Sequence, residues 1–253
     1  LKHDNLMQCY PHNTEKKYLF QCYEYLQGET LAQWLHRQEK PLNLDEILPI
    51  LQQTALALNA MHRLEMLHQD IRPKNIMVIN AENAMKIKLI DYGSTAVRGL
   101  VEINPKNANR ALGTLAFMAP EYFIDHSPSV HSDQFSLAVM AYYLFTKQLP
   151  YGTDLARCNS LKQMKKVQYH SIRKYRPDLP IWLDKILGQA LSIEPIHRFE
   201  ALSELIHNLM HPSKELLNSK PPAIIERDPL RFWQMSCAVL GLLFLLSIAW
   251  PFI

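Results

Sequence analysis

The chain has 253 residues, of which 48% are hydrophobic and 20% are charged, and its formal net charge is +3. This composition is typical of a globular protein with a substantial core, and so small a charge gives no support for a nucleic-acid partner. The four cysteines show no metal-binding spacing and no signal peptide precedes them, so reduced thiols in a cytosolic compartment are expected.

The first predicted elements are two β-rich runs, residues 1–10 and 18–26, joined by a polar turn. Thr30 is then placed to cap a short helix over residues 31–38. Asn43 and Glu46 have the spacing of a capping box and predict the start of a longer helix. This second helix has apolar residues at near-helical spacing and leads the chain to His68.

The most informative stretch is residues 66–93. Here Asp70 follows His68-Gln69, and Asn75 lies five residues after Asp70. Two short β-rich runs, 76–79 and 86–90, predict a hairpin, which is followed by Asp91-Tyr92-Gly93. We expect this hairpin to hold Asp70 and Asn75 at one end and Asp91 at the other, with the three groups converging on one cleft.

A long polar loop follows over residues 94–121 and ends in Ala119-Pro120-Glu121. Loops of this length without secondary structure are uncommon unless they are functional. Ser132-Asp133 then opens a helix with an apolar face, and two further helices are expected at 181–192 and 199–210.

The C-terminal part changes in composition. Residues 213–230 include Pro221-Pro222 and predict a semi-rigid linker. Residues 232–253 carry no charge, so we expect a transmembrane helix over 231–253. Arg227 and Arg231 precede it and nothing basic follows, which favours a cytoplasmic location for the large N-terminal part.

The order of these motifs resembles the signature set of eukaryotic-type protein kinases. The resemblance covers roughly residues 1–210 and implies an α+β fold with a mainly α-helical C-lobe. Residues 1–27 would be a remnant of the N-lobe sheet with the hinge, and residues 28–212 would be the C-lobe. Asp133 would then bind backbone N–H groups of the catalytic loop, and Arg198 would pair with Glu121.

The resemblance also assigns a site for Mg²⁺ and ATP. Asp70 would be the catalytic base, Arg72 would replace the usual lysine on the γ-phosphate, and Asn75 and Asp91 would hold the metal. Residues that would bind the adenine side of the nucleotide are Tyr23, Glu24, Tyr25, Leu26 and Met77. A protein hydroxyl would be the substrate. The expected activity is therefore that of an ATP-dependent serine/threonine protein kinase.

Four features depart from the family pattern. Two of them are expected to be mild: Tyr92 replaces a phenylalanine and fills the same apolar slot, and Ala138 replaces a frequent glycine of the central helix. The resemblance makes residues 94–121 the activation segment, in which Ser94, Thr95 and Thr114 are the residues that can be phosphorylated. Gln69 replaces an arginine that binds a phosphorylated activation loop in many kinases, so we expect activity to be independent of phosphorylation there. No Gly-rich loop or N-lobe lysine is present in the sequence, which would make it a fragment of a longer chain. A non-catalytic pseudokinase or scaffold is the alternative, and a small-molecule kinase ranks last because it is not expected to carry the Ala-Pro-Glu segment.

The residues within these motifs point to a particular group of protein kinases. With a membrane helix at the C-terminus, the chain is similar to the tail-anchored kinase half of bacterial proteins that also carry a metal-dependent serine/threonine phosphatase. This similarity implies a single-pass protein of the bacterial inner membrane, with its kinase domain in the cytoplasm.

Overall fold

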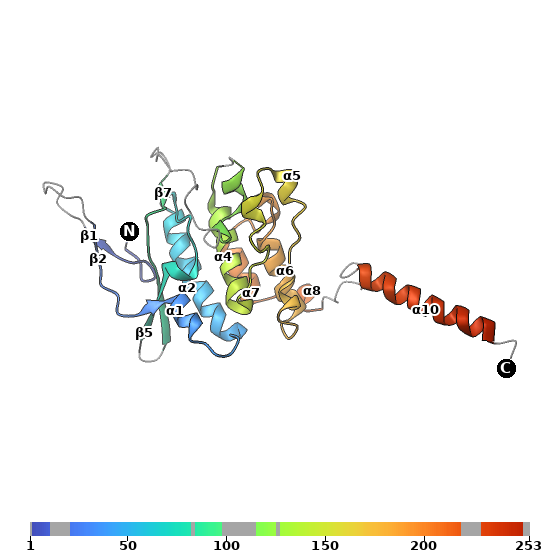
Figure 1. Ribbon diagram of the computed structural model, residues 1–253. Coiled ribbons are helices and arrows are strands. Elements are labelled where there is room, and N and C mark those ends of the chain that lie inside the picture. Colours follow the sequence, from blue (N-terminus) through green and yellow to red (C-terminus); the bar gives the residue numbers. More distant parts are fainter. Residues whose placement is uncertain are drawn as a thin grey trace.

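The computed structural model describes residues 2–10, 21–81, 84–97, 115–124, 127–218 and 229–249. In these ranges, three small sheets lie at the N-terminal side of a helical body (Figure 1). The strands are β1 (Cys9–Tyr10) with β2 (Cys22–Tyr23), β4 (Met66–Leu67) with β7 (Ala96–Val97), and a three-stranded sheet in the order β3 (Glu29–Thr30), β5 (Ile76–Ala81), β6 (Ala84–Leu89). This α+β arrangement agrees with the expected fold class.

The helices form most of the regular secondary structure in the described residues. The α-helices are α1 (Leu31–His36), α2 (Leu44–His62), α4 (Val130–Thr146), α5 (Leu161–Met164), α6 (Ile181–Ala190), α7 (Leu202–Met210), α8 (Lys214–Leu217) and α10 (Pro229–Ala249). Short 3₁₀ turns are η1 (Pro73–Asn75), η2 (Pro120–Phe123), η3 (Leu155–Arg157), η4 (Ile172–Lys174) and η5 (Pro195–His197). Thr30 and Asn43 both form the capping boxes that start α1 and α2, as predicted.

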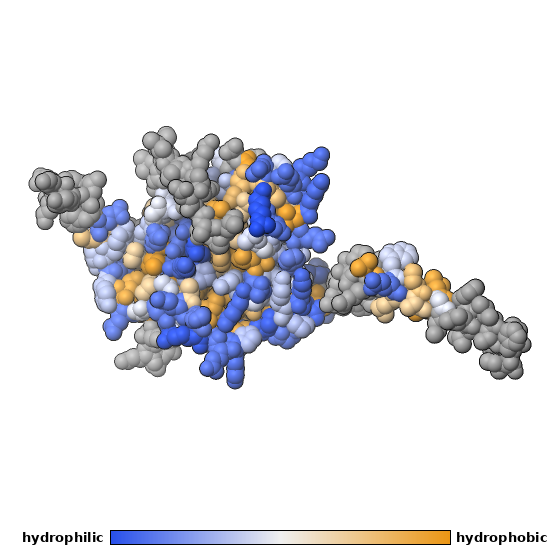
Figure 2. All heavy atoms as spheres, in the orientation of Figure 1, coloured by the Kyte–Doolittle hydropathy of each residue, from blue (hydrophilic) through white to orange (hydrophobic). Residues whose placement is uncertain are grey.

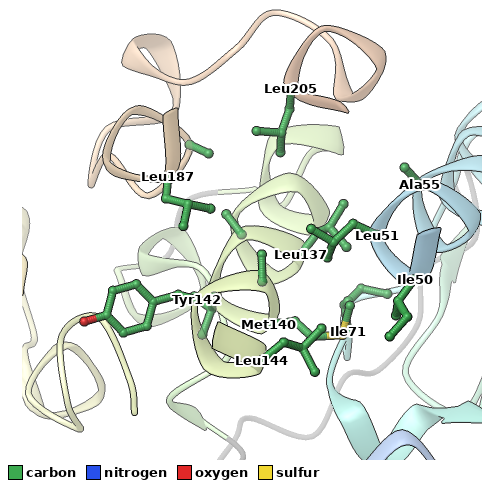
Figure 3. Packing of buried hydrophobic residues seen from close by; sticks show 14 of the residues in the cluster. Ile50, Leu51, Ala55, Ile71, Leu137, Met140, Tyr142, Leu144, Leu187 and Leu205 are labelled. Carbon is green, nitrogen blue, oxygen red and sulfur yellow. The ribbon is translucent and has the colours of Figure 1, made fainter. Parts of the chain in front are cut away.

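Helix α4 lies at the centre of the core (Figure 3). From Ser132 to Phe145, every side chain except that of Tyr143 is buried. Leu51 of α2, Leu187 of α6 and Leu205 of α7 belong to the same buried cluster. The sequence predicted that only one face of this helix would be buried, but α4 is covered on all sides. This is expected of a helix that is apolar all round.

The hairpin of β5 and β6 forms as predicted, with Ile76 opposite Leu89 and Ala81 opposite Ala84. Its turn residues, 82–83, lie outside the described residues. Asp91 was expected at the opposite end of the hairpin from Asp70 and Asn75, and the register shows that this is wrong. The residues that precede β5 and those that follow β6 lie at the same open end. The Ile90 N–H donates to the Asn75 carbonyl at 2.9 Å there. Asn75 and Asp91 are thus neighbours at one end of the hairpin.

The N-terminal segment is bound to this hairpin. The Leu89 N–H donates to the Asn5 carbonyl at 2.8 Å, and the Met7 N–H donates to the Leu89 carbonyl at 3.0 Å. The Gln53 side chain of α2 accepts from Asn5 Nδ2 and from the Ile87 N–H, both at 3.0 Å. The pairing of β1 with β2 agrees with the two predicted runs, although their connecting turn falls in the undescribed residues 11–20.

The C-terminal part differs from the expected linker and membrane helix. The linker was expected to begin at residue 213, but α8 is helical and its Leu216 packs against the core. Helix α10 lies apart from the helical body in Figure 1, and Figure 2 shows hydrophobic and hydrophilic residues together on its first half. Across the ranges that the structure describes, no helix combines the length and apolar character needed to cross a membrane. The expected span over 231–253 is therefore unsupported, and its last residues, 250–253, are not described.

Candidate active site

A buried carboxylate holds the loop that carries Asp70. Asp133, near the start of α4, accepts hydrogen bonds from the backbone N–H of His68 at 3.0 Å and of Gln69 at 2.9 Å. Its side chain is 0% exposed, and His62 Nε2 lies 2.8 Å from the same carboxylate. Gln69 adopts a φ of 67°, in the left-handed region that few non-glycine residues occupy. Asp133 therefore takes the predicted role and stabilises an unusual turn immediately before Asp70.

Asp70 and Asn75 form the next part of the site. Asn75 Nδ2 donates to the Asp70 carbonyl at 2.8 Å and to Asp70 Oδ2 at 2.9 Å. Asp70 Oδ1 is buried and has no hydrogen-bond partner among the described residues. A buried acceptor without a partner is costly, and a hydroxyl donor placed against it would remove that cost. The Asp70 carboxylate is thus suited to receive a hydrogen bond, and then a proton, from a substrate hydroxyl.

Asp91 reaches this end of the hairpin through the short segment that follows β6. It adopts a φ of 66°, and its Oδ1 accepts from the Gly93 N–H at 3.1 Å. The Asp91 side chain is exposed. The Asn75 Nδ2 group is occupied by Asp70, which leaves the Asn75 Oδ1 as the atom available to a cation.

The donor set fits Mg²⁺. No group of three or more His, Cys, Asp or Glu side chains in the described part of the chain could hold a metal. One carboxylate and one amide oxygen, however, match the way Mg²⁺ is bound beside substrate phosphates, because phosphate oxygens and water supply the remaining ligands. Asn75 and Asp91 are therefore the residues that would hold the ion.

His68 has a structural role, as expected. Its Nε2 lies 3.2 Å from the Ile90 carbonyl, and its ring meets the Tyr92 ring edge-on with centroids 6.2 Å apart. Burial lowers the pKa of His68 and outweighs the nearby carboxylates, so the imidazole stays neutral. A buried neutral histidine that contacts a backbone carbonyl helps to hold the loop before Asp70 in place.

Arg72 and Lys74 flank η1, which carries Asn75. Arg72 is half-buried at the N-cap of η1, and Lys74 is exposed within it. Their order after Asp70 puts two cations on the turn that ends at Asn75. The place of Arg72 near a phosphate stays a prediction.

The predicted nucleotide residues are spread over the hinge and β5. Tyr23 lies beside Tyr92 with ring centroids 6.4 Å apart, whereas Tyr25 is 91% exposed. Glu24 Oε1 accepts from Lys88 Nζ at 2.5 Å and from the Gln8 N–H at 2.6 Å, and the Glu24 N–H donates to the Gln8 carbonyl at 2.9 Å. Leu26 and Met77 are both half-buried.

Gly28 fixes the end of the hinge against β5, and the sequence analysis missed it. A Cβ at position 28 would lie 2.2 Å from the Val78 carbonyl oxygen. The next residues pair with β5, with Glu29 opposite Val78 and Thr30 opposite Met77. A lone glycine before a predicted strand is the signal that could have identified this close approach.

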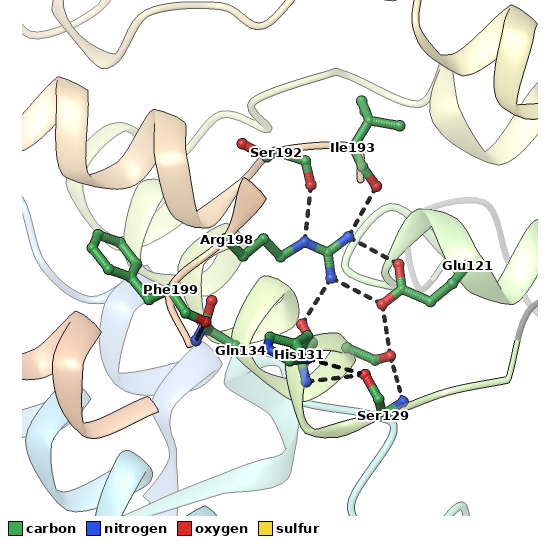
Figure 4. A network of polar contacts seen from close by, with 9 residues as sticks. Glu121, Ser129, His131, Gln134, Ser192, Ile193, Arg198 and Phe199 are labelled. Atoms are coloured by element: carbon green, nitrogen blue, oxygen red, sulfur yellow. Dashed lines mark hydrogen bonds and ion pairs between the residues drawn. The ribbon is translucent and has the colours of Figure 1, made fainter. Parts of the chain in front are cut away.

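A second buried carboxylate anchors the segment after the undescribed loop (Figure 4). Arg198 Nη1 and Nη2 each donate to one Glu121 carboxylate oxygen at 2.9 Å, which confirms the predicted pair. Ser132 Oγ also donates to Glu121 at 2.7 Å, and the Arg198 guanidinium donates to the backbone carbonyls of His131, Ser192 and Ile193. Of the predicted activation segment, residues 98–114 lie outside the described residues, Thr114 among them.

The comparisons with known proteins agree with this geometry. A family described as "Protein kinase domain" matches residues 1–212. The serine/threonine-protein kinase PrkC of Bacillus subtilis is 26% identical over 205 residues, which covers 81% of this chain and 31% of PrkC. The serine/threonine-protein kinase pkn3 of Myxococcus xanthus is 31% identical over 185 residues, which covers 71% of this chain and 34% of pkn3. The chain thus spans about a third of the length of these relatives.

A solved structure shows the same fold. The kinase domain of Mycobacterium tuberculosis PknI superposes with a TM-score of 0.63 at 23% identity, over 84% of this chain and 74% of that one. Because the family match covers most of the chain and includes Asp70, Asn75, Asp91, Glu121 and Arg198, the chain belongs to the protein kinase domain family.

Proposed function

We propose that this domain transfers the γ-phosphoryl group of Mg²⁺-ATP to serine or threonine hydroxyls of a protein. The observation that carries the proposal is the Asp70 carboxylate. One of its oxygens is bound by Asn75, and the other is buried without a partner in the described structure. That free acceptor is suited to a substrate hydroxyl, and the PrkC and pkn3 relatives are named serine/threonine-protein kinases.

Each residue of the site has a separate role in the proposed reaction. Asp70 orients the hydroxyl and accepts its proton as the oxygen attacks, while Asp133 keeps the loop in place through His68 and Gln69. Asn75 and Asp91 would hold the metal. When bound, Mg²⁺ neutralises charge on the β- and γ-phosphates. Arg72 would supply a further positive charge close to Asp70.

The test is the substitution Asp70→Asn in the complete protein. It keeps the shape of the side chain but removes its basicity, so phosphate transfer from ATP should fall by about 10²- to 10⁴-fold. The matched control is Asp154→Asn, which changes an exposed carboxylate beside Arg157 and should leave the rate unchanged. Unchanged transfer in a folded Asp70→Asn protein would exclude Asp70 as the base.

The alternative is a scaffold that binds a protein partner without catalysis. Gln69 favours it, because the side chain at this position is neutral and only 6% exposed. ATP binding separates the two functions. A kinase should bind ATP in the presence of Mg²⁺ and should lose that binding on Asp91→Ala. A scaffold should bind its protein partner equally well with and without ATP.

Attachment to a bacterial inner membrane remains a prediction from the sequence. Its support is the uncharged stretch 232–253 preceded by Arg227 and Arg231. Fractionation of cells that make the complete protein, with and without residues 229–253, tests it. Loss of the protein from the membrane pellet on truncation is the expected result, and equal amounts in the pellet would contradict it.

A further inference from the structure

The residue after Asp91 is a tyrosine whose hydroxyl makes contacts that a phenylalanine could not make. Tyr92 Oη donates to the Met7 carbonyl at 2.9 Å and lies 3.3 Å from the Leu89 carbonyl. Met7 in turn donates its N–H to the same Leu89 carbonyl at 3.0 Å. The hydroxyl therefore closes a small ring of polar contacts that joins the N-terminal segment, the end of β6 and the Asp91 loop.

The ring of Tyr92 has two aromatic neighbours. It packs between His68 and Tyr23, with centroid distances of 6.2 Å and 6.4 Å. Burial raises the pKa of Tyr92 and outweighs the Met7 hydrogen bond that would lower it. Met7 offers a carbonyl oxygen, which can only accept, so the Tyr92 hydroxyl is the donor in this contact.

The loop that Tyr92 fastens needs such support. Asp91 adopts a φ of 66°, a left-handed conformation that a non-glycine residue holds only when its surroundings impose it. Its side chain is exposed, and within the described part of the chain its carboxylate accepts one hydrogen bond, from the Gly93 N–H two residues on. Asp91 is thus held mainly through its neighbours, of which Tyr92 makes the long-range contact with Met7.

We propose that the Tyr92 hydroxyl is a positioning group that fastens the Asp91 loop to the N-terminal segment and holds Asp91 ready for the metal. The part of this proposal that concerns the metal rests on the proposed function. The fastening itself does not, because it concerns two backbone carbonyls and one hydroxyl of this chain. Sequence alone suggested that tyrosine and phenylalanine are equivalent here, and the Met7 contact contradicts that view.

The experiment compares Tyr92→Phe with a matched control in the complete protein. The control is Tyr142→Phe, which also removes a hydroxyl that donates to a backbone carbonyl, here that of His170 at 2.8 Å. Tyr142 lies in α4, and its hydroxyl contacts His170 rather than a residue of the Asp91 loop. Any effect shared by both variants is therefore a general loss of stability.

Hydrogen exchange of residues 91–97, measured without metal or nucleotide, is the first readout. One net hydrogen bond corresponds to roughly a 2- to 12-fold change in an opening equilibrium, so exchange should accelerate about that much in Tyr92→Phe. The N–H groups of Gly93 and Thr95, which donate to Asp91 and Tyr92, report on it. Exchange as slow as in the unmodified protein, or equally fast in Tyr142→Phe, would overturn the proposal.

The second readout is the Mg²⁺ concentration that gives half-maximal phosphate transfer. It should rise by a similar factor in Tyr92→Phe while the KM for the protein substrate stays constant. A changed exchange rate with an unchanged Mg²⁺ requirement would overturn the link between the hydroxyl and the metal. Loss of the proposed function would show separately, as transfer that survives Asp70→Asn.

Discussion

Arg198 and Glu121 form a bidentate ion pair with both N–O distances at 2.9 Å, although the two residues are 77 positions apart in the sequence. The Arg198 side chain is 0% exposed and that of Glu121 is 3% exposed. Because Arg198 also donates to carbonyls of three other residues, this one guanidinium joins η2, the start of α4 and the segment before η5. The pair therefore connects the end of the predicted activation segment to the helical core.

Removing one partner of this pair should strongly destabilise the domain. Arg198→Met leaves the Glu121 carboxylate buried without its counter-charge, so we expect a loss of about 3–5 kcal/mol in the free energy of unfolding. Urea unfolding measures it. Arg157→Met is the control, because its partner Asp154 is exposed and 3.8 Å away, and that change should cost less than about 1 kcal/mol. Similar losses for both variants would contradict the assignment.

The same pair predicts how stability depends on pH. Burial would raise the pKa of Glu121, but the Arg198 hydrogen bonds and charge outweigh it, and the folded-state pKa is below the ordinary value of 4.5. Its contribution is therefore fully present above the unfolded pKa and is lost as the pH falls through the lowered folded pKa. The free energy of unfolding should decline below about pH 4.5. Glu121→Gln should flatten that decline, and an equally steep decline in this variant would argue against it.

Gly28 and Gly188 should respond oppositely to substitution by alanine. At position 28 a Cβ would lie 2.2 Å from the Val78 carbonyl oxygen, so Gly28→Ala must displace the hinge from β5 and lower stability. At position 188, within α6, the nearest atom would be 3.6 Å away, which is ordinary contact. Gly188→Ala should therefore stabilise by about 0.5–1 kcal/mol, because alanine is the better helix former. Thermal unfolding of both variants decides the comparison.

Asp133 should tolerate no change of its acceptors. Asp133→Asn replaces one carboxylate oxygen with a donor, so one of the N–H groups of His68 and Gln69 loses its partner. We expect a loss of about 1–3 kcal/mol in the free energy of unfolding and a fall in activity, because the loop before Asp70 relaxes. Asp178→Asn, at an exposed carboxylate beside Arg176, provides the comparison. Full activity in folded Asp133→Asn would show that the loop holds its conformation without this carboxylate.

Gln69 predicts that activity does not require phosphorylation of the activation segment, residues 94–121. A neutral side chain cannot bind a phosphate group as arginine does, and Gln69 is buried beside Asp133. Protein treated with a phosphatase should therefore keep the activity of untreated protein. The idea fails if activity disappears on treatment and returns when Thr95 is phosphorylated again.

Much of this site could be predicted from the sequence because its signals are local. Capping boxes join residues three apart, so Thr30 and Asn43 could be assigned without knowing the path of the chain. The order of Asp70, Asn75 and Asp91 around two short β-runs likewise predicted the hairpin of β5 and β6 and indicated the family. Asp133 and the Glu121–Arg198 pair followed from the resemblance, and the structure confirms their contacts.

Other features were decided only by the tertiary structure, because their partners are distant in the sequence. The sequence shows that residue 92 is a tyrosine, but its hydroxyl bonds to Met7, 85 residues away. The requirement for glycine at position 28 comes from the Val78 carbonyl of another strand. The register of β5 and β6 decided that Asn75 and Asp91 lie at one end of the hairpin. Local composition selects the elements, whereas these contacts depend on how the folded chain brings distant backbone groups together.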